Sequence, residues 1–596
     1  MTCLILWYLW LISTFQLEFA TASTANTTTT AKSGTSSSTE DPFPVLAVGK
    51  DGRGNYYVNS TFGTPGQRQR LLVDIIQPYI NLVSGTSESH NEYSSVYHKH
   101  PSYLMNDSTS SVLVSPGQIY EISFIDGRAV NCTLVTDDMN FTNVSSENSS
   151  TALITDLMVT RDNVQFDSGS LSISNVSFFD IQSSNFKTSG LLGLSGKVTN
   201  PGNAIDSSQY TEQSYFLSLL KDADIIESSS YSLWLAGDTS TYKTYRDPIS
   251  NCGKLLLGGV DPSLFTGTLG KFDLIPYVDP VSNAVSVGYP IVPLGPIYIV
   301  SNSGQSLNMT SKDFLSPALL DSTSSVSYLP TSTIIQIAVQ IAATYVESLD
   351  RWLVQCSIAD MGVSLGFRLR ELTIEIPLCD LLSSTYDTST NSSMFFSSGQ
   401  EACFLTLYAN TNTGVNILGE AFMKNIYMAM DLEDNTIAIA QAKKVEDDAV
   451  TEETNETTAS TIIKKIKSGY IPYAKVMNSS NTRNLTLYPS YRSGYMFTVP
   501  GQLTAAYSNG VITGAGRSFY DTSRASTSAR PSSSQFDSFS VSASEEWSNS
   551  TNRTSSASGA GVRLSSPYTF NKDPAGHVTR IASLLLLSIF SILIVL

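Results

Sequence analysis

Two aspartates follow similar apolar runs, and a pair of carboxylates could carry out acid–base chemistry. Leu319 and Leu320 precede Asp321, which is followed by small hydroxyl residues, and residues 71–73 lead into Asp74 in the same way. A carboxylate at the end of a buried strand is costly to desolvate unless hydroxyls and backbone amides donate to it. Taken singly, each aspartate also fits an Asx-turn in a β-protein.

Each aspartate is followed further along the chain by a short apolar segment that contains glycine. Residues 190–194 (GLLGL) come after Asp74, and residues 415–419 (VNILG) come after Asp321. One order of parts, used twice, predicts a two-lobed protein with one carboxylate in each lobe. The elements that position the carboxylates would be strands that end in tight polar loops.

The composition restricts the fold class and the partners. The chain has 596 residues, enough for two or three domains or for one large bilobal unit with tails. Charged residues make up only 15%, aromatic residues 10%, and the formal net charge is −17. We therefore expect no nucleic-acid partner and more strands than helices. Neither the four histidines nor the six cysteines have metal-ligand spacing, so the spacing indicates no metal site.

The N-terminal end is typical of a secreted protein. Residues 1–22 predict a signal peptide, and a hydrophobic anchor is the alternative. Residues 23–44 are rich in Thr and Ser, which predicts a disordered N-terminal or pro segment. Removal of the signal peptide leaves five cysteines, so one thiol would stay unpaired. Asn-x-Ser/Thr sequons predict N-glycosylation at Asn59, Asn106, Asn131, Asn140, Asn143, Asn148, Asn175, Asn308, Asn391, Asn455, Asn478, Asn484, Asn549 and Asn552.

The C-terminal end predicts a stalk and a lipid anchor. Residues 446–570 are rich in Ser and Thr and are expected to form a linker and stalk, although the structure of residues 469–515 is left open. The last sixteen residues carry no charge, and they are shorter than the roughly 20 residues of a spanning helix. Residues 571–596 therefore predict a GPI-attachment signal, with Asn571 favoured as the attachment residue. A plain transmembrane anchor is the alternative.

Between these ends, alternating apolar residues predict many short strands. A hairpin is expected at residues 120–135 with its turn at Asp126 and Gly127, and another at residues 426–440. Two helices are expected, at residues 214–220 and at residues 332–349.

Several of these motifs, in their order, resemble a pepsin-type aspartic protease. The similarity covers about residues 45–445 and rests on residues 56–67, 254–261, 321–330 and 417–432. With its two tails the chain is also similar to the GPI-anchored fungal yapsin subgroup. The resemblance implies an all-β-dominated, bilobal fold with a few short helices, disordered tails, an N-terminal lobe at residues 45–240 and a C-terminal lobe at residues 241–445.

The resemblance also implies a mechanism that needs no metal and no cofactor. Asp74 and Asp321 would face each other across a cleft and hold one water. Like charges about 3 Å apart cannot both ionise, so the pair would share a proton and act at acidic pH. Phe124 would lie in the flap, and Ser322 and Thr323 would lie beside the substrate.

Further implications concern substrates, location and the cysteines. The yapsin subgroup cleaves protein or peptide substrates after basic residues at the cell surface. A GPI anchor would hold a monomer on the plasma membrane or in the cell wall. Cys356 and Cys403 would form the disulfide of the C-terminal lobe, while Cys132, Cys252 and Cys379 fit no family pairing.

The sequence departs from the family pattern Asp-Thr/Ser-Gly in both loops. Thr323 stands in place of the glycine, Ile75 in place of a hydroxyl residue, and the first loop is two residues longer. Phe124 replaces the flap tyrosine. Because Ile75 has no hydroxyl, Ser322 should lack its counterpart from the other lobe. Three hypotheses therefore stay open: an endopeptidase, a non-catalytic relative that binds peptide or wall polymer, and an adhesin-like wall glycoprotein.

Overall fold

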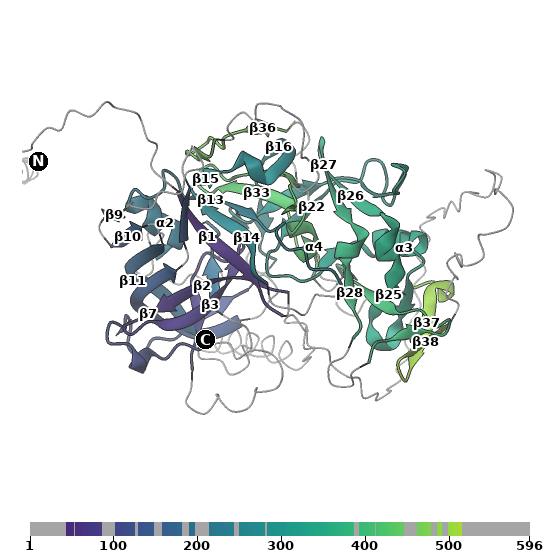
Figure 1. Ribbon diagram of the computed structural model, residues 1–596, viewed down its shortest axis with the longest axis horizontal. Helices are drawn as coiled ribbons and strands as arrows, with labels where there is room; N and C mark the ends of the chain where they lie inside the picture. Colours follow the sequence, from purple (N-terminus) through teal and green to yellow (C-terminus); the bar gives the residue numbers. More distant parts are fainter. Residues whose placement is uncertain are drawn as a thin grey trace, which may run out of the picture. The chain divides into compact units, whose positions relative to one another are not determined.

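The fold is mainly β, and it is described here from a computed structural model (Figure 1). Three short α-helices occur in the described part, α2 (Phe216–Asp222), α3 (Thr331–Gln340) and α4 (Glu420–Met423). The predicted signal peptide, residues 23–42 of the predicted N-terminal segment, the Ser-dominated residues 521–566 and the attachment signal lie outside the described residues. The structure describes residues 43–514 except 53, 86–101, 125–128, 143, 148–157, 162, 168, 182–189, 197–213, 243–248, 281–282, 387–391, 412, 446–461, 478–484 and 491–498.

Asp74 lies at the end of a strand in the first of two similar arrangements. The strands are β2 (Tyr56–Phe62), β3 (Gln67–Asp74), β4 (Asn81–Val83), β11 (Ser170–Ile181) and β12 (Gly190–Gly193). Strand β3 pairs antiparallel with β2 and parallel with β12, and β4 pairs antiparallel with β12 and parallel with β11. The long strand β7 (Ala129–Thr142) pairs with both β11 and β2.

Asp321 follows a strand in the second arrangement. The strands are β19 (Ile291–Leu294), β22 (Ser316–Leu320), β23 (Ser327–Leu329), β31 (Leu407–Ala409) and β32 (Asn416–Leu418). Strand β22 pairs antiparallel with β19 and parallel with β32, and β23 pairs antiparallel with β32 and parallel with β31. This repeats the pairing around Asp74 strand for strand, as the two apolar runs and their glycine segments predicted.

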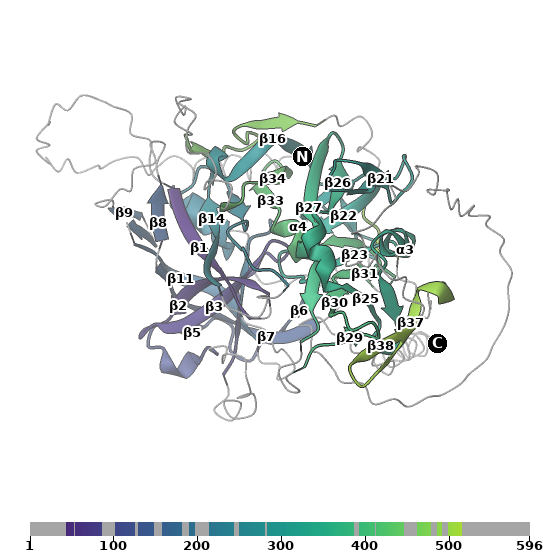
Figure 2. The same cartoon turned by 45° about the vertical axis from the view of Figure 1, so that its right-hand side comes forward.

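The two halves of the chain share one sheet. The strands β13 (Ser230–Trp234), β14 (Ile249–Leu257) and β16 (Phe265–Asp273) continue the sheet of the first half. The hairpin of β33 (Ile426–Asp431) and β34 (Thr436–Ala442) pairs with β13 and β16, and Figure 2 shows β33, β34 and β16 together. A continuous apolar core contains residues of both halves, including Leu71, Leu192, Leu320 and Leu418.

The helix predicted at residues 332–349 is shorter in the structure, so that prediction was wrong at its C-terminal end. Helix α3 ends at Gln340, and Ala342 has a left-handed backbone with φ 49° that an α-helix does not continue through. The next residues form β24 (Thr344–Val346), which pairs antiparallel with β25 (Arg351–Gln355). The helix predicted at residues 214–220 is present as α2, shifted by two residues.

Strands also occur beyond Lys444, within the region predicted as linker and stalk. They are β35 (Lys464–Lys465), β36 (Ala474–Val476), β37 (Thr504–Ser508) and β38 (Val511–Gly514). Residues 469–515, whose structure the sequence left open, contain three of these strands, and β35 lies just before them. They lack a long apolar period, and their buried residues only acquire a partner when the remaining fold is in place.

Candidate active site

Backbone amides hold the Asp74 and Asp321 carboxylates in matching turns. Oδ1 of Asp74 accepts from the amides of Ile76 at 2.8 Å and Gln77 at 3.0 Å. Oδ1 of Asp321 accepts from the amides of Thr323 at 2.8 Å and Ser324 at 3.1 Å. The two aspartates are only 5% and 7% exposed, so these donors offset part of the cost of burying each charge.

A glycine stands behind each turn because there is no room for a side chain. A Cβ atom on Gly193 would lie 2.4 Å from the Tyr79 carbonyl oxygen, and one on Gly419 would lie 2.2 Å from the Val326 carbonyl oxygen. Gly193 is also the register partner of Asp74. The glycine segments seen in the sequence are therefore the places where a returning strand passes closely behind each aspartate loop.

Ser322 brings the two aspartate loops together. Its hydroxyl donates to the Val73 carbonyl oxygen at 2.6 Å and accepts from the Ile75 amide at 3.3 Å. Val73 and Ile75 flank Asp74, so this hydroxyl bonds on both sides of the first aspartate. The side chain of Ile75 is fully buried in the apolar core and cannot return a hydrogen bond. The link thus has the one-sided form expected from the sequence.

The missing glycines do not disturb the two turns. Ile76 and Thr323 occupy corresponding positions, and neither has the positive φ that would require glycine. The Thr323 hydroxyl donates to Oδ1 of Asp321 at 2.7 Å, so this substitution adds a donor to the carboxylate. In the longer first loop the ring of Tyr79 packs edge-on against Phe179, with ring centroids 5.3 Å apart.

Phe124 lies at the end of the predicted flap hairpin. Strand β6 (Tyr120–Ser123) pairs antiparallel with β7, while the predicted turn at residues 126–127 is outside the described residues. The half-buried Phe124 ring packs against an apolar cluster made of Tyr57, Leu72 and Leu191. Leu72 is two residues before Asp74, so the phenyl ring reaches the strand that carries the first aspartate.

A buried ionic network next to the aspartate loops was missed in the sequence. Lys50 Nζ lies 2.7 Å from Asp238 Oδ2 and 2.5 Å from Glu420 Oε1. The Glu420 amide donates to the Ser324 carbonyl oxygen at 2.8 Å, which ties the network to the second loop. Lys50 follows an apolar run, as Asp74 does, and this run was the feature of the sequence that could have indicated a buried lysine.

The network fixes the charges of its members. Burial opposes ionisation of Asp238, but the charges of Lys50 and Lys424 more than offset it and lower the pKa of Asp238 to about 2. Burial likewise opposes the charge of Lys50, and Glu420 and Asp238 nevertheless raise its pKa. Behind the first loop, burial and the charge of Asp74 raise the pKa of Tyr231 well above its usual range.

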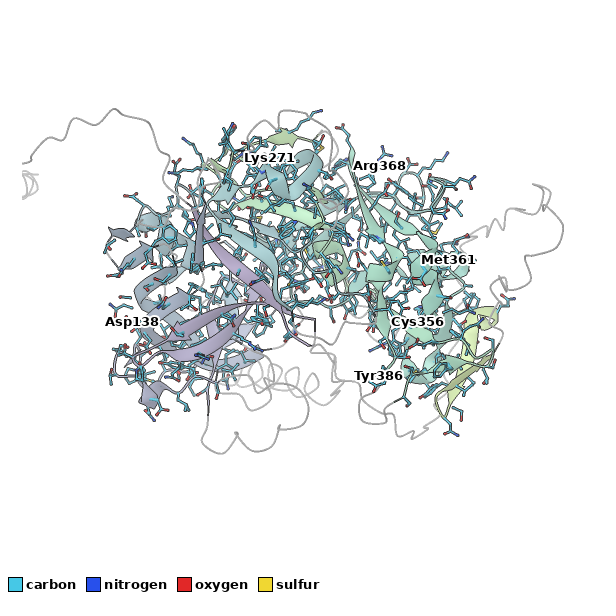
Figure 3. All side chains as sticks on the ribbon, viewed as in Figure 1. Asp138, Lys271, Cys356, Met361, Arg368 and Tyr386 are labelled. Atoms are coloured by element: carbon cyan, nitrogen blue, oxygen red, sulfur yellow. A yellow bond between two sulfur atoms is a disulfide. The ribbon has the colours of Figure 1, made fainter. Side chains whose placement is uncertain are left out.

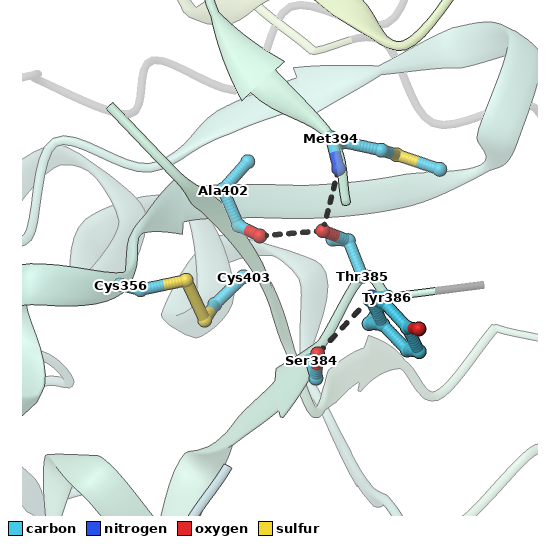
Figure 4. Close-up of a disulfide and its surroundings, with 7 residues drawn as sticks. All are labelled: Cys356, Ser384, Thr385, Tyr386, Met394, Ala402 and Cys403. Atoms are coloured by element: carbon cyan, nitrogen blue, oxygen red, sulfur yellow. Dashed lines mark hydrogen bonds between the residues drawn. A yellow bond between two sulfur atoms is a disulfide. The ribbon is translucent and has the colours of Figure 1, made fainter. Parts of the chain in front are cut away.

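Cys356 and Cys403 form a disulfide, as the resemblance implied (Figure 4). It joins the end of β25 to β30 (Ala402–Leu405), and nearby Thr385 donates to the Ala402 carbonyl oxygen. Cys132, Cys252 and Cys379 are free thiols.

The predicted glycosylation sites are only partly described. Asn59, Asn106, Asn131, Asn175 and Asn308 are exposed, and Asn140 is half-buried. The other sequons and Asn571 lie outside the described residues. Within the described ranges there is no cluster of potential metal ligands and no helix with the length and apolar character to cross a membrane.

Comparison with known proteins identifies the family. Residues 55–442 match the family described as eukaryotic aspartyl protease. The chain belongs to this family. Among aspartyl proteases of the family it is similar to aspartic proteinase yapsin-7 of Saccharomyces cerevisiae, with 99% identity over 596 residues that cover both chains completely.

More distant aspartyl proteases match over part of their length. Aspartic proteinase yapsin-3 of Saccharomyces cerevisiae is 28% identical over 277 residues, which cover 46% of this chain and 49% of the relative. Secreted aspartic protease 7 of Candida albicans is 28% identical over 311 residues, or 48% of each chain. The matched region of the family includes both aspartate loops and ends at β34.

Proposed function

We propose that this yapsin-like aspartyl protease is an active endopeptidase in which Asp74 and Asp321 act as a pair. The observation that carries the proposal is the Ser322 hydroxyl, which bonds to the residues on both sides of Asp74. It draws the turn of one carboxylate against the turn of the other. The amide donors on each Oδ1 support a fixed orientation of both carboxylates.

The proposed reaction is hydrolysis of a peptide bond by general acid–base catalysis. One carboxylate takes a proton from a water as the water attacks the peptide carbonyl, and the other carboxyl group donates a proton to the carbonyl oxygen. The tetrahedral intermediate then releases the amine as a proton moves to its nitrogen. Because one carboxyl must be protonated and the other ionised, we expect activity at acidic pH.

We further propose that the substrates are secreted or cell-wall proteins and that cleavage occurs at basic residues. The similarity to yapsins supports this, as does the net charge of −17, which favours the approach of cationic peptides. A GPI anchor at Asn571 would hold the monomer at the plasma membrane or in the wall. Release of the protein by a phosphatidylinositol-specific phospholipase C from cells stripped of their wall tests the anchor, and retention on these cells would contradict it.

We also propose a second candidate function, because the Ile75 side chain cannot return the hydrogen bond that the Ser322 hydroxyl makes. A non-catalytic relative would bind peptide or wall polymer at the same loops without turnover. It would have the same affinity for a peptide whether or not Asp74 is present.

The deciding experiment uses the glycosylated full chain and a library of peptides with single and paired basic residues at pH 3–7. We expect hydrolysis that falls by about 10³-fold or more in Asp74→Asn and in Asp321→Ala. Alanine is preferred at residue 321 because asparagine there would create a new Asn-Ser-Thr sequon. The control is Asp222→Asn, an exposed residue far along the chain from both loops. Peptide binding without cleavage by the folded wild-type protein would favour the second function.

A further inference from the structure

Three segments of the C-terminal extension are paired with the protease fold. They are residues 462–477, 485–490 and 499–514, which we call the strap, and all lie beyond the family match that ends at residue 442. Strand β35 pairs with β15 (Gly259–Val260) and β36 with β16, while β37 pairs with β24 and β38 with β29 (Phe395–Phe396). Each pairing supplies partners for main-chain N–H and C=O groups that would otherwise stay unpaired at a strand edge.

The first segment is anchored by buried apolar residues and by main-chain bonds. Ile463 packs with Phe43, Val45 and Leu256 near the start of the described chain. Ile466 is fully buried, its amide donates to the Gly258 carbonyl oxygen, and its own carbonyl accepts from the Ser228 hydroxyl. These contacts join the segment to the first half of the protein.

The same segment satisfies a buried carboxylate. The Gly469 amide donates to Oδ2 of Asp431 at 2.7 Å, and Asp431 is the last residue of β33. On the outer side Lys271 donates to the Gly469 carbonyl oxygen at 3.0 Å, and Figure 3 places Lys271 on β16. The Gly469 backbone thus bonds to a residue of β33 through its amide and to a residue of β16 through its carbonyl.

The second segment contacts two parts of the second half. The Leu487 amide donates to the Pro276 carbonyl oxygen at 2.8 Å, and its carbonyl accepts from the Val278 amide at 2.9 Å. Three residues later the Ser490 amide donates to the Gly414 carbonyl oxygen at 2.9 Å. Gly414 lies two residues before β32, the strand beside Asp321, so this segment contacts the part of the chain that supports the second aspartate loop.

The third segment covers the far edge of the second half. Strands β37 and β38, yellow-green in Figure 1, form a hairpin near β25. Ile512 is buried with Val346, Leu353 and Ala402, and its carbonyl accepts from the Ser397 amide.

We propose that the strap, residues 462–477, 485–490 and 499–514, forms part of the folded protease unit and holds both halves through strand addition. In this proposal the unit extends at least to Gly514, beyond the end of the family match. The strap binds through main-chain pairing and buried apolar residues, so it stays bound without a peptide link to residue 445. The role of the strap is separate from the proposed activity, and the strap would bind in the same way in a catalytic and in a non-catalytic protein.

The test cuts the chain in front of the strap after folding. A recognition sequence for a site-specific protease is inserted within residues 446–461 of the full chain, and the purified protein is cleaved. We expect the strap fragment to co-elute with the body on size exclusion and to separate only in denaturant. Release of the fragment under native conditions would overturn the proposal.

A pair of adjacent variants tests the second segment in the cleaved protein. Leu487 is 3% exposed and its neighbour Tyr488 is 54% exposed. We expect Leu487→Asp to speed release of the fragment by at least tenfold, and Tyr488→Asp to leave release unchanged. Equal behaviour of the two variants would refute the role of residues 485–490. If Leu487→Asp prevents folding of the full chain, Leu487→Ala in the same assay gives the comparison.

Discussion

The Ser322 hydroxyl joins the two aspartate loops. Ser322 donates to Val73 and accepts from Ile75, whereas the neighbouring Ser324 hydroxyl donates to Val326 within its own loop. The two serines are of the same type and in the same turn, but only one reaches the other half. This difference offers a matched pair of substitutions.

We predict that Ser322→Ala lowers the free energy of unfolding by about 1–3 kcal/mol, because two buried hydrogen bonds are lost. It should also reduce kcat on a peptide substrate more than it changes KM, because the orientation of one loop against the other is loosened. Ser324→Ala serves as the control. Chemical denaturation and steady-state kinetics give both quantities, and equal effects of the two variants would contradict the bridging role.

Asp180 is a buried acid outside the aspartate loops. It is 4% exposed, its Oδ1 has no hydrogen-bond partner among the described residues, and burial raises its pKa to about 7. In an unfolded chain the same carboxyl titrates near 3.9. Between about pH 4 and pH 7 the folded protein therefore binds the extra proton, and the stability falls as the pH rises.

We predict that Asp180→Asn removes this loss. Its melting temperature should exceed that of the wild type at pH 7 and approach it at pH 4, because asparagine carries no charge into the buried site. Thermal melts at pH 4, 5, 6 and 7 measure the difference. Asp222→Asn, at an exposed position, is expected to leave the slope unchanged. A uniform shift of Asp180→Asn at all pH values would argue against titration of this carboxyl.

At the scale of elements, the parts that sequence could predict are those fixed by local pattern. The strands before Asp74 and Asp321 follow from apolar runs, and Gly193 and Gly419 follow from the need for close approach. The end of α3 was not predictable from periodicity, because the apolar spacing continues through Ile341 and Tyr345 while the backbone turns at Ala342. There, the tertiary pairing of β24 with β25 outweighs local helical preference.

The longer-range features were not predictable from the sequence. Lys50 stands in a Gly-Lys-Asp-Gly run that is typical of a solvated turn, and its partner Asp238 is 188 positions away. The strap segments are short, mix apolar with polar residues, and are separated from the family region by a Ser/Thr-rich stretch. In both cases the stabilising contact exists only in the assembled fold. By contrast, the resemblance alone indicated the Cys356–Cys403 pair.

At the scale of the whole molecule, the Lys50 network joins β1 (Phe43–Lys50) of the first half to α4 of the second. Figure 2 shows α4 close to β23 and β33. The lysine is almost completely buried between two carboxylates. Since the pKa of Asp238 is lowered to about 2, the stability it contributes is present above about pH 4 and is lost as the pH falls toward 2.

We predict that Lys50→Met lowers the free energy of unfolding by about 3–5 kcal/mol near neutral pH, because it leaves buried carboxylates without their cation. The loss should be smaller at pH 3, where protonation removes part of the uncompensated charge. Lys221→Met breaks the more exposed pair with Glu433 and is expected to cost no more than about 1 kcal/mol. Urea denaturation at both pH values measures this, and a pH-independent loss would contradict the electrostatic origin.

The pairing of β13 with β33 has a consequence for the way the chain is made. The register runs from Ser230 opposite Asp431 to Trp234 opposite Tyr427, so nearly two hundred positions separate strands that lie side by side. A nascent chain that has left the ribosome only as far as α3 cannot close this sheet. The edge of β13 that pairs with β33 stays exposed until the final hairpin is synthesised, and folding intermediates with exposed strand edges are prone to aggregate. Translation speed and chaperone supply should therefore influence the yield of this protein more than that of one whose sheets close locally.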